Sequence, residues 1–315
     1  MEIGEIFIRD VISHPQPSGM IYCRGFNKMG YNPYYLPYEN NISLNQIDYN
    51  YDSSKTTILI DYTNILHNPN HIEELKYFKL QNPNSKIFLS AYLPYNNEKG
   101  KGVIEEWKAY QGLVDKIFNT AFSFPYAEEL FNSVGLNYLN LPFSFDDAYS
   151  IPSEFINYDY DISFIGSTIE GDRYLNIWYN PLSNNNNYKT FFSGFNNYPS
   201  TPFEQTYKIY NTSKINLNPH YSHQFGEDKG YGSIFDFNAR TFALAGMGCF
   251  QLSNHPYYKE IFGNDIPVFN KNNFIDLINY YLKNDDERDK ISSKMQQIIL
   301  DKHTTECRIK TLLEL

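Results

Sequence analysis

The sequence has few cysteines and no long apolar run. Its three cysteines, Cys23, Cys249 and Cys307, lie far apart and form no C-x-x-C pair, which predicts free thiols in a reducing compartment rather than a disulfide framework or a zinc site. No stretch approaches the ~18 apolar residues of a membrane-spanning helix, and the N-terminus MEIGEIFIRD lacks the basic start of a signal peptide. These absences predict a soluble, cytoplasmic protein without a membrane span.

Positive charge is scarce as well. The 315 residues include 26 lysines and arginines against 36 aspartates and glutamates, which gives a net charge of −10. A protein that binds nucleic acid by neutralising many phosphates needs the opposite balance. The composition therefore argues against a general nucleic-acid-binding protein.

Apolar and aromatic residues, in contrast, are plentiful, at 42% and 17% of the chain. They supply enough material for a packed core, and a length of 315 residues predicts about two domains. Short apolar runs alternate with amphipathic stretches, a pattern typical of βαβ units and a parallel sheet. The predicted strands are 5–8, 33–36, 57–61, 86–91, 116–119, 138–141, 160–165, 190–193, 214–218 and 249–252.

A polar segment with two prolines, 142–157, separates two arrays of such units. We therefore predict an α/β protein of two Rossmann-like domains, 1–150 and 151–315, that face each other across a cleft. The last helix is expected to pack back on the first domain.

The segment 236–250, DFNARTFALAGMGCF, is the most informative part of the sequence. Asn238 and Arg240 open an apolar helix, so polar side chains and backbone N–H groups converge at a helix N-terminus, where an anion is stabilised. An arginine at this place suits a bidentate grip on phosphate. On the pattern alone, an ordinary βα unit with a surface arginine is the competing interpretation.

The same segment resembles the "R-x-F-E…A-x-G" helix of the glycosyltransferases related to the spore-coat protein CgeB, a group with GT-B architecture. Further similarities follow in the family's order along the second half of the chain. They lie at 161–167 (DISFIGS), 207–218 (YKIYNTSKINLN), 259–262 (KEIF) and 277–308. In the first half only 114–146 carries a recognisable trace, so the resemblance covers about half of the sequence.

This resemblance implies a glycosyltransferase that moves a sugar from a nucleoside-diphosphate sugar, most often a uridine diphosphate sugar, to an acceptor on the first domain. It implies no resident cofactor and no metal, because fixed cations and helix N–H groups stabilise the departing diphosphate. It favours retention of the anomeric configuration. The donor-binding residues carried over by position are Gly166, Ser167, Arg173, Asn218, His220, Asp236, Asn238, Arg240 and Thr241.

One position departs from the family pattern. Where the family has a glutamate after the phenylalanine, this chain has Ala243, which removes the carboxylate expected to hold the donor ribose. Either Asp236 takes over that task, or the donor differs, or the chain is a catalytically silent relative that binds nucleotide sugars or glycans. A nucleotide-sugar epimerase on the same architecture is a further alternative, although the paired carboxylates that it needs do not occur near these motifs.

Two residues of the first half are candidates for catalysis. His14 lies in the loop HPQPSG after the first predicted strand, where it would act as a base or orient the acceptor. Asp61 ends a predicted strand at the edge where open α/β sheets bind ligands. A turn residue and a strand-terminal cap are the plain alternatives. The acceptor itself stays open among a glycan, a protein, a small molecule and a modified DNA base.

Two further patterns resemble metal sites by composition only. Asp159-Tyr160-Asp161 is formally a D-x-D, but it stands at the start of a predicted strand. His220 and His223 have no cysteine or glutamate at a spacing that completes a tetrahedral set. We therefore predict no metal site, and we expect His220 to line the donor pocket or to lie in a surface loop.

Overall fold

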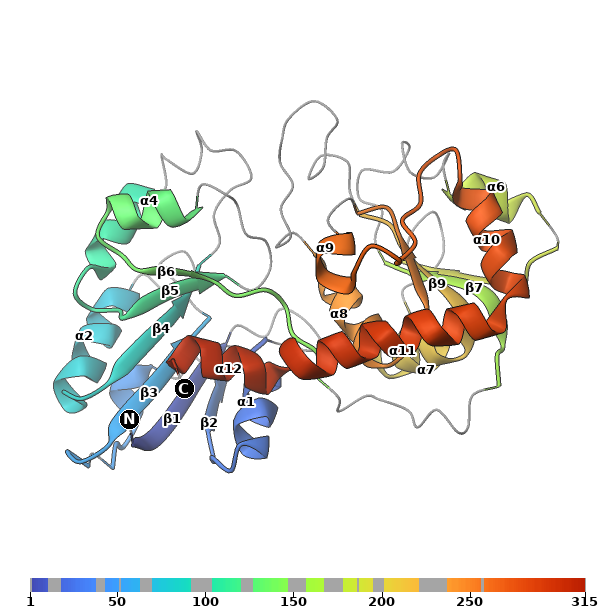
Figure 1. Ribbon diagram of the computed structural model, residues 1–315. Helices are drawn as coiled ribbons and strands as arrows, with labels where there is room; N and C mark the ends of the chain where they lie inside the picture. Colours follow the sequence, from blue (N-terminus) through green and yellow to red (C-terminus); the bar gives the residue numbers. More distant parts are fainter. Residues whose placement is uncertain are drawn as a thin grey trace. The chain divides into compact units, whose positions relative to one another are not determined.

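The computed structural model describes residues 2–10, 18–37, 43–50, 52–62, 70–91, 104–119, 127–146, 157–166, 178–185, 187–194, 201–220, 237–255 and 258–314. The chain divides into two compact units. Unit 1 comprises Met1–Pro142 together with Thr305–Leu315, and unit 2 comprises Phe143–Thr304. Each unit is built on its own parallel sheet (Figure 1).

The sheet of unit 1 has six parallel strands in the order β2-β1-β3-β4-β5-β6. The last five residues of β1 and of β3 are buried without interruption, as expected for parallel strands that are covered on both faces. The strands are β1 Ile3–Asp10, β2 Tyr34–Pro37, β3 Thr56–Asp61, β4 Lys86–Ser90, β5 Lys116–Asn119 and β6 Tyr138–Asn140.

Alternate strand residues of unit 1 pack into two separate cores. Phe7 and Leu59 belong to the core that contains residues of α2 (His71–Gln81) and α4 (Ala127–Ser133), whereas Ile8 and Ile60 belong to the core of α1 and α12. This division follows from the two-residue period of a strand. The remaining elements are α1 Ser18–Lys28, α12 Thr305–Leu313 and the short 3-10 helices η2 Leu44–Gln46 and η3 Lys108–Tyr110.

The C-terminal helix α12 therefore belongs to unit 1, where it lies beside α1 (Figure 1). The approach is close at Gly25 of α1, because an added Cβ would lie 2.7 Å from Cγ2 of Thr305 and 2.8 Å from Cδ1 of Ile309. A glycine at this position is what lets the two helices pack so tightly.

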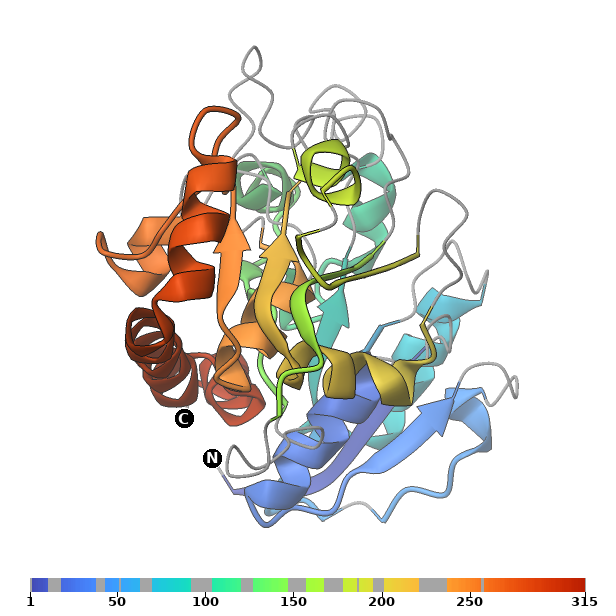
Figure 2. The same cartoon turned by 90° about the vertical axis from the view of Figure 1, so that its right-hand side faces the viewer.

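The sheet of unit 2 has four parallel strands in the order β10-β9-β7-β8, seen side by side in Figure 2. The strands are β7 Tyr160–Ile165, β8 Thr190–Ser193, β9 Ser213–Asn218 and β10 Gln251–Ser253. The helices are α6 Asn180–Ser183, α7 Phe203–Asn211, α8 Ala239–Gly246, α9 Tyr258–Phe262, α10 Phe274–Lys283 and α11 Asp285–Lys302. One core, which includes Trp178, Phe242 and Met295, holds these elements together.

The α/β class with parallel sheets is confirmed. Each predicted strand is present among β1 to β10, with ends that differ by at most two residues. The division of the chain at 142–143 falls within the predicted linker. In the part of the chain that the structure describes, every helix is too short or too polar to span a membrane.

Candidate functional site

A polar cluster lies in unit 2 where the carboxyl ends of β9 and β10 meet the N-terminus of α8. β9 ends at Asn218, β10 ends at Ser253, and α8 begins directly after Asn238. In open parallel sheets this edge is the usual place for a ligand, because helix N-termini and loop side chains point to it. The cluster is therefore the first candidate for a functional site.

Asn238 is the N-cap residue of α8. Its backbone is extended, with φ −72° and ψ 160°, and its Oδ1 accepts a hydrogen bond from the backbone N of Thr241 at 3.0 Å. An asparagine satisfies this donor as well as an aspartate does. Because it is neutral, it leaves the partial positive charge of the helix N-terminus uncompensated.

Asn218 connects three neighbouring elements through its amide group. Its Nδ2 donates to Oγ1 of Thr241 at 2.8 Å and to Oε1 of Gln251 at 3.0 Å, and its Oδ1 accepts from Nδ2 of Asn238 at 3.0 Å. Gln251 in turn donates to the carbonyl of Thr241 at 2.9 Å. Asn218, Thr241 and Gln251 are fully buried, so a neutral network fixes α8 on the sheet.

His220 completes the network at the end of β9. Its Nδ1 lies 3.0 Å from the carbonyl oxygen of Asn218 and 3.2 Å from Oγ of Ser253, while its Nε2 lies 3.5 Å from Oγ1 of Thr241. A carbonyl oxygen only accepts hydrogen bonds, so the network assigns the proton to Nδ1. Nε2 is then an acceptor that faces a hydroxyl group.

A second imidazole, His255, stands beside the first. The rings of His220 and His255 are 4.8 Å apart at their centroids, and His255 stacks on Phe237 at 3.9 Å. Burial lowers the pKa of His255 to about 3. Burial, His255 and Arg240 together hold the pKa of His220 well below its ordinary value. Both imidazoles therefore stay neutral at neutral pH.

Arg240, in the first turn of α8, supplies positive charge at this edge. Its Cζ lies 4.8 Å from the ring centroid of Phe164 on β7. Its guanidinium group also touches Gly166, which follows β7. Its Nη1 is shielded from solvent and has no hydrogen-bond partner within the described residues. A buried N–H group without a partner is costly, and an anionic ligand at this point would satisfy it.

The structure brings together all of the predicted donor-binding residues that it describes. Asn218, His220, Asn238, Arg240 and Thr241 lie in the cluster, and Gly166 lies against Arg240. The predicted residues His14, Ser167, Arg173 and Asp236 lie outside the described residues, as does His223. The role of each in donor binding or catalysis stays a prediction.

Sequence reasoning missed His255. Its signal was the dipeptide Asn254-His255, one residue beyond the predicted strand 249–252, at the same edge as His220. Ala243, where the resemblance to the CgeB-related group leads us to expect a glutamate, lies on α8 and packs against the core of unit 2. The alanine therefore contributes to packing, and the effect of the missing carboxylate on donor binding stays a prediction.

The D-x-D pattern lies at the opposite edge of the sheet, at the amino end of β7. Oδ1 of Asp161 pairs with Nζ of Lys214 at 2.8 Å, and Oδ2 accepts from the backbone N of Lys189 at 2.9 Å. Asp161 thus has two partners of its own that hold the start of β7. Among the described residues, no three His, Cys, Asp or Glu side chains are grouped as a metal site.

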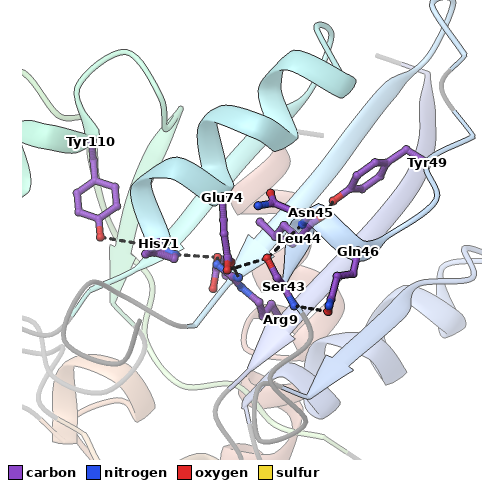
Figure 3. Close-up of polar contacts among 10 residues, drawn as sticks. Arg9, Ser43, Leu44, Asn45, Gln46, Tyr49, His71, Glu74 and Tyr110 are labelled. Carbon is purple, nitrogen blue, oxygen red and sulfur yellow. Dashed lines mark hydrogen bonds and ion pairs between the residues drawn. The ribbon is translucent and has the colours of Figure 1, made fainter. Parts of the chain in front are cut away.

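Unit 1 also carries a polar cluster near the carboxyl ends of its strands β1 and β3 (Figure 3). Nε and Nη2 of Arg9 donate to Oδ2 of Asp61 at 3.0 and 2.6 Å, and Nη1 donates to Glu74 of α2. Nε2 of His71 lies 3.0 Å from the same Asp61 oxygen, and its Nδ1 lies 2.8 Å from the hydroxyl of Tyr110. Arg9, Asp61 and His71 are fully buried.

Asp61 is therefore engaged within the protein. Burial raises the pKa of Asp61, but the charge of Arg9 and the contact with His71 outweigh this effect and hold the pKa well below its usual range. A buried, ionised and paired carboxylate is poorly suited to accept a proton near neutral pH. This geometry favours a structural role, and the catalytic role of Asp61 stays an untested prediction.

Comparison with known families bears on the second half of the chain. Residues 158–314 match the family model described as "Glycosyl transferase-like". No curated protein matches the chain significantly. The finer relationship to the CgeB-related group stays a prediction.

Several solved structures share the fold. HepE from Anabaena, solved with UDP-glucose, has a TM-score of 0.54 at 8% identity, over 99% of this chain and 100% of HepE. Sucrose-phosphate synthase from Thermosynechococcus elongatus has a TM-score of 0.52 at 8% identity, over 99% of this chain and 98% of the synthase.

TarM from S. aureus has a TM-score of 0.50 at 12% identity, over 82% of this chain but only 54% of TarM. The matched part thus spans about half the length of TarM. At these identities the likeness is one of fold. The chain has the GT-B fold of these glycosyltransferases, and its residues 158–314 are similar to the glycosyltransferase-like family model.

Proposed function

We propose that this protein is a glycosyltransferase whose unit 2 binds a nucleoside-diphosphate sugar and whose reaction needs neither a metal ion nor a resident cofactor. One observation carries the proposal. Arg240, the neutral cap Asn238 and the N-terminus of α8 lie together at the carboxyl edge of a parallel sheet. This is the arrangement that a protein uses for a phosphate group.

The chemistry of sugar transfer explains why such an arrangement is useful. The bond between the anomeric carbon and the diphosphate oxygen breaks, and negative charge grows on the departing diphosphate. A guanidinium group and the dipole of α8, held in place before the reaction, stabilise that charge without reorganising. We assign this role to Arg240 and to the first turn of α8.

For the nucleotide we propose uridine diphosphate. HepE was solved with UDP-glucose, and TarM was solved with UDP, and both share the fold of this chain. Because His220 and His255 stay neutral, neither imidazole changes the charge of this site between about pH 6 and 8. Binding of UDP-glucose is therefore expected to vary little across this range.

The acceptor is proposed to bind unit 1, with retention of the anomeric configuration, and its chemical class stays open among a glycan, a protein, a small molecule and a modified DNA base. Both parts of this proposal rest on the family resemblance. Proton NMR of the first product formed would show the configuration of the new linkage directly.

The experiment that tests the proposal is a panel of UDP, GDP, ADP and their glucose conjugates, followed by melting temperature and calorimetry. Ligand binding to the folded state raises its melting temperature, so at least one of these compounds should do so. Release of free sugar is then measured with and without EDTA. Turnover that is lost in EDTA and restored by a divalent cation would contradict the metal-independent mechanism.

Ala243 supports a second candidate, a catalytically silent relative that binds a nucleotide sugar. This chain has a methyl group on α8 where the family has a carboxylate for the donor ribose. Hydrolysis of the donors in the panel separates the two candidates. Release of free sugar from any donor excludes the silent relative. Donor binding without turnover, even when acceptors of each class are added, favours it.

A further inference from the structure

The turn after β7 holds an unusual contact between a glycine and an arginine far apart in sequence. In a nucleotide-binding α/β sheet, the glycine of such a turn is expected to let the backbone approach phosphate. Here the space beside Gly166 is occupied by Arg240: an added Cβ would collide with Nη2 and would lie 3.1 Å from Cζ. Any larger residue at 166 must therefore displace the guanidinium.

The guanidinium group is enclosed by protein on several sides. The Phe164 ring lies under it, with Cζ of Arg240 4.8 Å from the centroid. The side chain of Tyr210 is a further contact, through a hydrogen bond with Arg240. Burial raises the pKa of Tyr210, and the charge of Arg240 together with this hydrogen bond opposes that rise. Tyr210 is anchored in turn, since Nδ2 of Asn216 donates to its carbonyl at 3.1 Å.

The backbone on the far side of Gly166 is equally constrained. The N of Gly166 donates to the carbonyl of Ser193 at 3.1 Å. Gly194, with φ +89°, lies so close that an added Cβ would be 2.9 Å from the carbonyl oxygen of Gly166. A left-handed residue in such contact with another backbone has to be glycine. The turn at Gly166 is thus held against β8 and cannot easily yield to Arg240.

We infer that Gly166 is a positioning residue for Arg240. Because Gly166 has no side chain, it leaves a notch in which the guanidinium group of Arg240 lies, and the two residues together bind the diphosphate of the donor. The role of the ligand in this inference rests on the proposed function, whereas the docking itself rests on geometry. An arginine that is already ordered loses less conformational freedom when it binds an anion. Its Nη1, without a partner within the described residues, is the group presented to a phosphate oxygen.

The alternative is that Gly166 contacts phosphate through its own backbone, independently of Arg240. A double-mutant cycle separates the two, because residues that act as one unit show non-additive effects. The variants are Gly166→Ala, Arg240→Ala and the double variant. Gly4→Ala is the matched control, since its added Cβ would lie 3.1 Å from Cβ of Lys55, and both residues belong to unit 1 rather than to the unit proposed to bind the donor.

Binding of UDP-glucose is measured by calorimetry for the wild type and all four variants. We expect Gly166→Ala and Arg240→Ala each to weaken binding roughly 10-fold or more, as the loss of a charge-assisted contact does. The double variant should be within about two-fold of Arg240→Ala. Gly4→Ala should bind as the wild type does. Additive losses in the double variant would overturn the inference.

Docking is also measured without a ligand, by NMR of the arginine Nε–Hε groups. The signal of Arg240 is identified by its loss in Arg240→Ala, and the ring of Phe164 should shift it away from the exposed arginines. In Gly166→Ala we expect this shift to disappear while the melting temperature changes little. An unshifted signal in the wild type would overturn the inference. A shifted, Gly166-dependent signal in a protein that binds none of the nucleotides would support docking and refute the proposed function.

Discussion

The polar clusters of the two units lie at the same edge of their parallel sheets, yet they are built from opposite kinds of side chain. In unit 1 Arg9 forms ion pairs with both Asp61 and Glu74 in a buried group. In unit 2 the contacts of Arg240 within the described residues, Phe164, Gly166 and Tyr210, carry no counter-charge. A charge that has its counter-charge inside the protein serves the fold, whereas a charge among neutral groups is available to a ligand.

The difference also explains why only one of the two edges carries the proposed donor site. Asp61 and Glu74 would repel a diphosphate, and the guanidinium group of Arg9 is already engaged by both carboxylates. In unit 2 the cap of α8 is an asparagine and the first turn of the helix holds no acidic residue, so neither adds a carboxylate at the helix N-terminus.

The largest effect is expected from breaking the buried group of unit 1. Asp61→Asn leaves Arg9 and His71 without their shared charged partner, and the free energy of unfolding should fall by about 3–5 kcal/mol. Urea unfolding measures this loss. Binding of UDP-glucose to the folded variant should not change. The control Asp159→Asn removes an exposed carboxylate and should change stability by less than about 0.5 kcal/mol; a similarly small change for Asp61→Asn would contradict a structural role.

Removal of the charge in unit 2 should affect the reaction rather than the fold. Arg240→Ala is expected to reduce the rate of donor cleavage by roughly 10²–10³-fold, because a fixed group that stabilises developing charge is lost. The control Lys259→Ala removes a surface cation of α9 and should leave this rate unchanged. Equal rates for wild type and Arg240→Ala would remove Arg240 from the mechanism.

As pH falls, protonation of His255 should destabilise unit 2 at a higher pH than protonation of Asp61 destabilises unit 1. His255 has a pKa of about 3 in the folded protein and about 6.5 when unfolded, so the unfolded chain binds one more proton between these values. Stability therefore falls by up to about 1.4 kcal/mol per pH unit below pH 6.5 for this group. His255→Phe should reduce that slope, measured by urea unfolding at pH 6.5 and 4.5.

The contribution of Asp61 to stability is also lost toward acid, but at a lower pH than that of His255. Its folded pKa is depressed below the unfolded value of about 3.9, so its stabilisation is complete above about pH 5 and is lost only as pH falls through and below 3.9. Asp61→Asn should therefore leave the slope between pH 6.5 and 4.5 unchanged. An unchanged slope in His255→Phe would instead show that this imidazole is not the group that titrates.

The smallest effect is expected at the helix cap. Asn238→Ala removes the acceptor for the N–H of Thr241 and should lower the free energy of unfolding by about 1 kcal/mol, whereas Asn238→Ser keeps a neutral cap and most of the stability. Urea unfolding of both variants measures the difference. Equal stability of the two would show that the cap bond contributes little.

Local patterns predicted the elements and the position of α8. The strands follow from short apolar runs, and the start of α8 follows from Asn238 before an apolar helix. Contacts between distant residues had no such signal. Arg9 and Asp61 are 52 positions apart, and the notch at Gly166 receives a side chain from α8.

His255 was missed for the same reason. Its partner His220 reaches it only because β9 and β10 are neighbours in the sheet. The sequence indicated which residue types stand at the ends of strands, while the order of the strands decides which of them meet. The same order placed Asp61 beside Arg9, where a sequence pattern alone could not distinguish a catalytic carboxylate from a buried ion pair.

The central claim is that the neutral edge of unit 2, with Arg240, is the donor site. Calorimetric titration of UDP-glucose into the wild type and Arg240→Ala tests it most directly. The account predicts saturable binding to the wild type and at least a roughly 10-fold weaker affinity for the variant. Equal affinity of the two proteins, or no binding of any nucleotide of the panel to the wild type, would contradict it.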